Sequence, residues 1–334
     1  MKNLFPLACF LLGMAACSNE LDIAADYREI PVIYGLLNDA ENTHYIQVLR
    51  GFMDDKSNAL RIARNPDSLF YSESVVLKVE RNGQPVTISR IDAATIGLAR
   101  QPGVFIDSPN YVYTFQENLL ENHTYRLTFT NQETGTTVTA ETRIVKDFDI
   151  TYPLTALEVN LVKDLNITWN AAENGKIYQL LFRFHFLQWK ADDPLNKDTL
   201  FADIPIFNGL TSSGTTGGER MNFNLEGNAF FSSLRNALTV DQNIRRRALD
   251  APLELIFYVG SEELFNYISI NSVQSGITSL QVKPEYTNIQ GGLGIFGSRL
   301  VKSVKGYRLT NASLDSLSCG QYTRALYFTN WSCN

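Results

Sequence analysis

The sequence has 334 residues, of which 44% are hydrophobic and 19% charged, and its formal net charge is −6 at pH 7. An apolar content of this size excludes a disordered chain, and the length predicts about two domains. The acidic balance excludes an electrostatic basis for binding nucleic acid, so we expect no nucleic-acid partner.

The N-terminal segment has the composition and order of a secretory signal. A lysine follows the initial methionine, and the apolar run 4–15 is shorter than the roughly 20 residues of a membrane-spanning helix. The small residues directly before Cys17 resemble the lipoprotein box of bacteria, which implies a signal peptide over 1–16 and acylation of Cys17. Residues 17–28 would then be a tether to the membrane. An ordinary cleaved signal with a chance cysteine is the alternative.

Residues 29–146 have the pattern of a first β-sandwich domain. Apolar or alternating runs such as IPVIYGLLN and THYIQVLRGF predict strands, and the hairpin signal Asn82-Gly83 lies between two more. Short strands with frequent turns are typical of a sandwich. Between the second and third strands, residues 53–71 are predicted to form a surface insertion with a short helix that ends at Pro66.

Residues 147–310 are predicted to form a second domain. A tryptophan-bearing strand, a polar turn and a long strand resemble the start of a fibronectin type III or immunoglobulin-like module. Alternation in the long strand YQLLFRFHFLQW places apolar side chains on one face and Arg183, His185 and Trp189 on the other. The segments GNAFFSSLRNALTVD and EELFNYISINS predict short helices. The basic run IRRR at 244–247 is predicted to be a solvated helix face or an interface patch.

These patterns together predict a fold class that is mainly β. We expect two β-sandwich-like modules of the prealbumin, immunoglobulin or fibronectin III kind, with short helical insertions.

A glycine-rich run near the C-terminus has the spacing of a dinucleotide-binding loop. The run GLGIFG spans 292–297, but the segment SRLVKSVKGYRL that follows it alternates like a strand, whereas a nucleotide loop leads directly into a helix. We therefore predict no bound dinucleotide and no other cofactor. The glycines would instead allow a tight turn, a bulge or close backbone approach, so that the chain bends back across the sheet into its last strand.

The same region resembles a known family. The run VKPEYTNIQGGLGIFGSR is similar to the closing motif of a family of Bacteroidota lipoproteins of unknown function, domain of unknown function 4249. The motif residues that we expect to be structural are Tyr286, Asn288, Gly291, Gly292, Gly294, Phe296 and Gly297. The resemblance implies a lipid-anchored protein of the outer membrane, on its periplasmic or its surface-exposed face. Because genes of this type often lie near TonB-dependent receptors, it also implies such a receptor as a partner.

The C-terminal tail, 311–334, contains Cys319 and Cys333. Disulfides persist in exported proteins, and no Cys-x-x-Cys pair or histidine lies nearby, so we predict a disulfide rather than a metal site. Closing a loop of about 15 residues stabilises by roughly 3 kcal/mol in the chain-entropy model. Two free thiols are the alternative.

Three tripeptides resemble the Asp-Ser/Thr-apolar signal for O-glycosylation of exported Bacteroidota proteins. The candidate residues are Ser68, Thr199 and Ser316.

The sequence contains no recognisable catalytic set. His44, His123 and His185 belong to different predicted strands, without the spacing of a metal pair or of a nucleophile with its base. Adjacent carboxylates make no acid–base pair, because neighbouring side chains in a strand point apart. We therefore assign no catalytic residue and no metal site, and we expect the protein not to be an enzyme.

Aromatic side chains, at 11% of the chain, are the remaining indication of a binding site. Candidates for a platform that stacks on a sugar or a peptide are Tyr111, Tyr113 and Trp189, together with Tyr258 and Tyr267. Packing inside the sandwiches is the alternative, and burial distinguishes the two.

Three function hypotheses remain. The first is a non-enzymatic, lipid-anchored outer-membrane or cell-surface protein that binds a ligand or acts as an accessory to a TonB-dependent transporter. The second is a surface hydrolase for glycan or peptide, which two carboxylates about 5 to 10 Å apart in a cleft would favour. The third is a structural or adhesion protein, which predicts rod-like packing of the modules and no pocket.

Overall fold

The computed structural model describes residues 30–51, 63–98, 100, 103–106, 108–272 and 286–333. The predicted signal peptide 1–16, the tether 17–28 with Cys17 and most of the insertion 53–71 lie outside the described residues.

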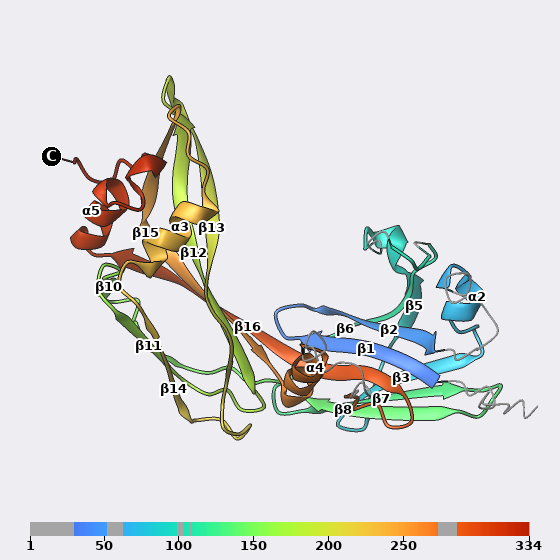
Figure 1. Ribbon diagram of the computed structural model, residues 1–334. Helices are drawn as coiled ribbons and strands as arrows, with labels where there is room; N and C mark the ends of the chain where they lie inside the picture. Colours follow the sequence, from blue (N-terminus) through green and yellow to red (C-terminus); the bar gives the residue numbers. More distant parts are fainter. Residues whose placement is uncertain are drawn as a thin grey trace, which may run out of the picture.

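One nine-stranded sheet runs through the whole molecule, in the order β13-β12-β15-β16-β1-β2-β6-β5, with β10 also paired to β16 (Figure 1). The strands span Asp193–Thr211 (β13), Ile177–Lys190 (β12), Ile244–Gly260 (β15), Leu293–Leu309 (β16), Ile30–Asn38 (β1), Thr43–Gly51 (β2), Tyr111–Gln116 (β6), Ser89–Asp92 (β5) and Glu158–Val159 (β10). The mainly β fold class is therefore confirmed.

The large sheet is shared by two halves of the molecule, which we call the N-terminal and the C-terminal lobe. In each lobe one smaller sheet packs on the large sheet, and a hydrophobic core lies between the two. The N-terminal lobe has the sheet β4-β3-β7-β8, and the C-terminal lobe has the sheet β14-β11-β9. These strands span Gln84–Val86 (β4), Val75–Arg81 (β3), Thr124–Asn131 (β7), Thr137–Arg143 (β8), Arg220–Leu225 (β14), Leu165–Asn170 (β11) and Ile150–Tyr152 (β9). Each lobe is thus a sandwich-like unit, as the alternation of the sequence predicts.

The burial pattern of β12 follows the prediction from alternation. Its apolar row is 0% or 1% exposed and packs in the C-terminal core beside Trp169 of β11; the row consists of Tyr178, Leu180, Phe182, Phe184 and Phe186. The opposite row, with Arg183 and His185, is only partly buried.

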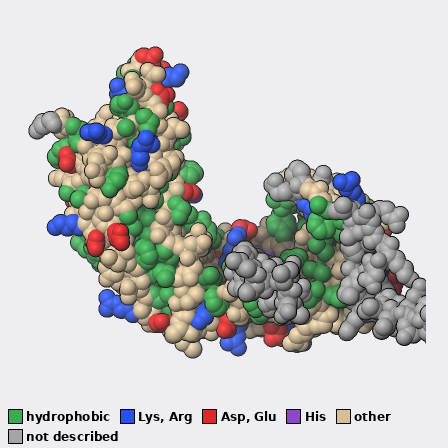
Figure 2. Space-filling view, in the orientation of Figure 1, with side chains coloured by type: hydrophobic (Ala, Val, Ile, Leu, Met, Phe, Trp, Pro, Cys, Tyr) green, Lys and Arg blue, Asp and Glu red, His purple; other side chains and the backbone are tan. Residues whose placement is uncertain are grey.

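β16 joins the two lobes. Its first half pairs in parallel with β1, from Leu293 to Arg299, and its second half pairs antiparallel with β15. Phe296 packs in the N-terminal core and Leu300 in the C-terminal core, so both cores lie on the same face of the sheet. The other face is turned toward the hollow between the lobes (Figures 1 and 2). The predicted domain boundary at residue 146 assigns 289–299 to the second domain, but in the structure this segment packs in the N-terminal lobe.

The glycine motif serves this parallel pairing. Gly294 has φ +105°, and a Cβ there would collide with the carbonyl oxygen of Ile33 in β1. Asn288 holds the neighbouring strand, because its Nδ2 donates to Phe296 O at 2.6 Å and its Oδ1 accepts from Phe296 N at 2.9 Å. The prediction of close backbone approach is confirmed. The predicted bend is confined to the turn at Gly291, with φ +84°, because residues 293–297 already belong to β16.

Short helices interrupt the strands. They are α2 (Pro66–Leu69), α3 (Ala229–Ala237), α4 (Glu262–Ser272) and α5 (Asn311–Cys319), with 3-10 turns η1 (Ala93–Ile96) and η3 (Arg324–Leu326). The helices predicted from GNAFFSSLRNALTVD and EELFNYISINS are α3 and α4. Pro66 is the first residue of α2, where its missing N–H costs nothing. The helix predicted before Pro66 falls mostly on residues outside the described ranges, and Ala63, the first described residue of this segment, is helical.

The basic run 244–247 is not a helix face. It begins β15, and Arg246 is 1% exposed. Its guanidinium donates to Leu326 O at 2.9 Å, Gln188 Oε1 at 2.9 Å and Thr239 O at 3.2 Å. The prediction of a solvated patch was wrong at this residue because three acceptors replace its water.

The C-terminal tail packs on the C-terminal lobe. Leu317, Leu326 and Phe328 belong to its core. Cys319 and Cys333 form a disulfide with their Cα atoms 5.5 Å apart, so the predicted pairing is confirmed.

Candidate functional site

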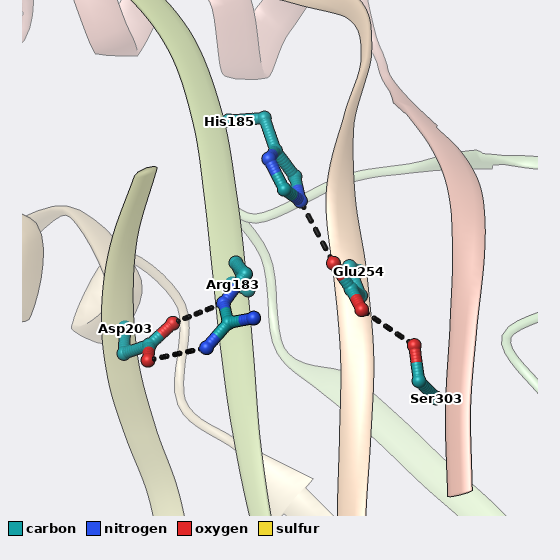
Figure 3. Close-up of polar contacts among 5 residues, drawn as sticks. All are labelled: Arg183, His185, Asp203, Glu254 and Ser303. Carbon is teal, nitrogen blue, oxygen red and sulfur yellow. Dashed lines mark hydrogen bonds and ion pairs between the residues drawn. The ribbon is translucent and has the colours of Figure 1, made fainter. Parts of the chain in front are cut away.

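A polar cluster lies on the face of the large sheet that is opposite the two cores, which we call the inner face. Figure 3 shows its five residues on four neighbouring strands: Asp203 on β13, Arg183 and His185 on β12, Glu254 on β15 and Ser303 on β16. The register places Arg183 directly between Asp203 and Glu254. Directly opposed side chains in a sheet lie close enough to interact.

Arg183 and Asp203 form a two-pronged ion pair. Arg183 Nε donates to Asp203 Oδ1 at 2.7 Å, and Nη2 donates to Oδ2 at 2.8 Å. These hydrogen bonds raise the pKa of Arg183, so the guanidinium stays charged at every physiological pH. The pair is partly exposed, and it fixes the orientation of the guanidinium rather than contributing much stability.

Glu254 is the buried centre of the cluster and is 3% exposed. His185 Nε2 lies 2.8 Å from Glu254 Oε2, and Ser303 Oγ donates to Glu254 Oε1. Burial acts to raise the pKa of Glu254, but the hydrogen bonds from Ser303 and His185 outweigh it, and the pKa is lowered. Glu254 is therefore an ionised carboxylate at neutral pH.

The order of these three groups differs from that of a nucleophile with its base. A catalytic serine needs a base that takes its proton, with the acid behind that base. Here the carboxylate lies between the hydroxyl and the imidazole, so Ser303 donates to Glu254 and His185 contacts the other oxygen. These hydrogen bonds instead hold the side chains of Ser303, Glu254 and His185 in fixed positions on the inner face of the sheet.

An exposed aromatic ring completes the inner-face cluster. Phe201 on β13 is 55% exposed, and the Cζ atom of Arg183 lies 4.2 Å from its ring centroid. The ring of His185 lies 6.2 Å away. A large ring held in solvent beside an oriented guanidinium is a typical feature of recognition surfaces.

The sequence predicted only part of this cluster. It placed Arg183 and His185 on one face, but it favoured a solvated loop over 191–198 and assigned no strand to 199–209, so it missed Phe201 and the strand that carries Asp203. Residues 194–201 are all exposed, so they lack the half-buried alternation that identifies a strand. Which carboxylate meets Arg183 depends on register between strands, which no local pattern contains.

The predicted aromatic candidates do not form one platform. Tyr111 and Tyr113 line a hollow in the N-terminal lobe, whereas Trp189 lines another at the far end of β12. Tyr267 lies edge-on to Tyr34, with ring centroids 6.4 Å apart, and Tyr258 is on β15.

The histidines are also separate. His44 is 2% exposed, and its Nε2 lies 2.9 Å from Glu117 O in the N-terminal lobe. His123 precedes β7, and His185 belongs to the inner-face cluster. Within the described ranges, no group of three or more histidine, cysteine, aspartate or glutamate side chains is placed to hold a metal ion.

The candidate glycosylation residues lie on three elements. Ser68 is in α2, Thr199 is exposed in β13 and Ser316 is in α5. Their modification stays a prediction.

A sequence profile described as Domain of unknown function (DUF4249) matches residues 19–304. The chain belongs to this family. The resemblance to this family is carried by residues 283–299. The last seven of them, 293–299, form the parallel pairing of β16 with β1. The search of curated proteins found no match to this DUF4249 chain. Of the helices that the structure describes, none has the length and apolarity needed to cross a membrane.

Proposed function

We propose that this DUF4249 protein is a non-enzymatic accessory protein, held at the outer membrane by acylated Cys17, which docks a TonB-dependent transporter on its inner face. The lipoprotein box supports the anchor, since several acyl chains on one cysteine contribute about 0.8 kcal/mol for each buried methylene. The transporter as partner rests on the family resemblance.

The observation that carries the proposal is the contrast between the two faces of the large sheet. One face is covered by both smaller sheets, whereas the other carries the oriented Arg183–Asp203 pair and the exposed ring of Phe201. Arginine and aromatic side chains are enriched at the centres of protein interfaces. The shape and the chemistry of this face suit a macromolecular partner.

Co-purification after mild solubilisation of membranes tests the docking role. Phe201→Ala removes the exposed ring without opening the core, and Leu195→Ala is the matched control, because Leu195 is 91% exposed on the same strand. We expect the wild type and Leu195→Ala to recover a TonB-dependent transporter, and Phe201→Ala to recover at least fivefold less. Recovery of the wild-type chain alone, repeated under mild conditions, would contradict the proposal.

A further inference from the structure

A second recognition site lies in the N-terminal lobe, away from the inner-face cluster. A hollow of about 610 Å³ opens between the segment after α2 and the strands β5 and β6. Its walls, which we call the tyrosine–arginine pocket, are formed by Tyr71, Val75, Arg90, Asp92, Tyr111 and Tyr113. The volume lies within the range of about 300 to 1,000 Å³ that is usual for small-ligand sites.

Arg90 is held in one orientation at the wall of this pocket. Its Nη2 donates to Tyr71 O at 2.8 Å, and its Cζ lies 4.2 Å from the ring centroid of Tyr111. Tyr111 is in turn fixed edge-on by Phe70, with centroids 5.4 Å apart. No carboxylate of the described chain forms an ion pair with Arg90. The guanidinium is therefore preorganised to donate hydrogen bonds to a ligand.

The pocket also offers hydroxyl groups and hydrogen-bond acceptors. Burial raises the pKa of Tyr113, so its hydroxyl stays protonated and can both donate and accept. Asp92 Oδ1 accepts from Ala94 N at 3.1 Å and Asn110 N at 3.0 Å, which fixes this carboxylate on the wall. Two further carboxylates, those of Asp67 and Glu73, lie at the exposed rim.

The charge balance selects among ligand classes. Three carboxylates and one guanidinium line the pocket. An anionic ligand is repelled by Asp67 and Glu73, and a cation placed at Tyr111 is repelled by Arg90, which already lies over that ring. A neutral ligand with many hydroxyls meets neither repulsion, because each hydroxyl can accept from Arg90 and donate to a carboxylate. The ring of Tyr111, which is only partly buried, adds an apolar surface to this wall for the C–H groups of a sugar.

We propose that the tyrosine–arginine pocket binds a neutral saccharide. This inference goes beyond the docking role proposed above, because it uses residues outside the inner face. The saccharide lies beside the Arg90–Tyr111 pair, and its hydroxyls bond to Arg90, Tyr113 and the rim carboxylates.

Calorimetric titration of the full acylated chain tests the proposal, in micelles of a detergent without a sugar headgroup. The neutral probes are hexasaccharides of α- and β-linked glucose, of mannose, galactose and xylose, and of N-acetylglucosamine. The charged probes are hexagalacturonate and the hexamer of glucosamine. We expect saturable binding of at least one neutral probe, and at least tenfold weaker binding of both charged probes. Saturation by no neutral probe, or tightest binding of a charged one, would overturn the proposal.

Variants locate the site. Arg90→Gln and Tyr111→Leu should weaken binding of the neutral saccharide at least tenfold. Arg126→Gln, which changes an exposed ion pair of the same lobe, should bind the saccharide like the wild type. If either variant unfolds, Tyr113→Phe removes one hydroxyl alone and should weaken binding at least threefold. Unchanged binding by folded variants would place the saccharide elsewhere and refute the assignment.

The two proposals fail separately. Loss of saccharide binding with intact recovery of the transporter rejects the pocket and leaves the docking role. Intact saccharide binding with recovery of the chain alone rejects the docking role.

Discussion

Asp39 lies in the turn between β1 and β2, close to where the lobes meet. Burial raises the pKa of Asp39 to about 6; the backbone of Val301 opposes the rise, and the nearby carboxylates of Glu121 and Asp147 add to it. An unfolded aspartate titrates near 4. Ionised Asp39 is therefore less favourable in the folded protein than in the unfolded chain, and it lowers stability above about pH 6. As the pH falls from about 6 to about 4, the folded state takes up the proton first and becomes more stable.

Replacing Asp39 by asparagine should remove this penalty. Asp39→Asn should raise the free energy of unfolding by about 1 kcal/mol at pH 8, after allowance for solvent screening, and change it little at pH 4.5. Urea unfolding at the two pH values measures the difference. The control is Asp250→Asn, which changes an exposed carboxylate of β15. An equal effect of Asp39→Asn at both pH values would show that burial does not disfavour its charge.

Gly294 is a residue whose lack of a side chain decides a strand pairing. Gly294→Ala should destabilise the protein by at least ~3 kcal/mol, because the new methyl group collides with Ile33 O and β1 must move. Gly306→Ala isolates the steric part, since Gly306 has φ +97° with no atom within 4 Å of an added Cβ. It should cost only about 1 kcal/mol through backbone strain. Thermal unfolding of both variants tests this, and equal losses would refute the role of close approach.

At the scale of elements, Arg246 ties β15 to the C-terminal tail. Arg246→Gln should cost about 2 to 4 kcal/mol, because the buried carbonyl of Leu326 loses its donor and the hydrogen bonds to Thr239 O and Gln188 Oε1 are lost with it. Arg247→Gln, at an exposed neighbour, should change stability by less than about 0.5 kcal/mol. Urea unfolding compares the stability of the two variants. Faster proteolysis of the tail in Arg246→Gln alone would support the role of Arg246 in holding the tail on β15. Equal stability of the two variants would contradict it.

Elements with half-buried alternation were predictable, and elements without it were not. β12 and the hairpin β3–β4 follow the sequence pattern, because Asn82 and Gly83 adopt the positive φ values that a two-residue turn needs. β13 extends past the core, so its exposed half has no apolar period. Consequently the sequence could place Arg183 and His185 on one face of a strand. That Asp203, Glu254 and Ser303 lie beside them follows only from the pairing of β13, β12, β15 and β16 in the structure.

At the scale of the whole molecule, the unforeseen feature is the sheet that both lobes share. The parallel pairing of β16 with β1 connects the two ends of the described chain, and local periodicity contains no information about such a contact. The sequence predicted two sandwiches in succession, but β16 makes them one bent body. Ser298 strengthens this corner, since its Oγ donates to Arg143 O at 2.6 Å and accepts from Val145 N at 3.3 Å.

This bent body gives the proposed function its geometry. A shared strand keeps the inner face of the C-terminal lobe turned toward the hollow between the lobes (Figure 1). The tyrosine–arginine pocket lies in the other lobe. One molecule can therefore present a docking face and a saccharide pocket at the same time, provided that a lipid holds it at the membrane.

The most direct test of the central claim is metabolic labelling with a radioactive fatty acid, followed by fractionation of the cells. We predict that the wild-type chain carries the label and sediments with the outer membrane, whereas Cys17→Ser carries none and is released. A wild-type chain that stays unlabelled and is found free in the medium would contradict the account.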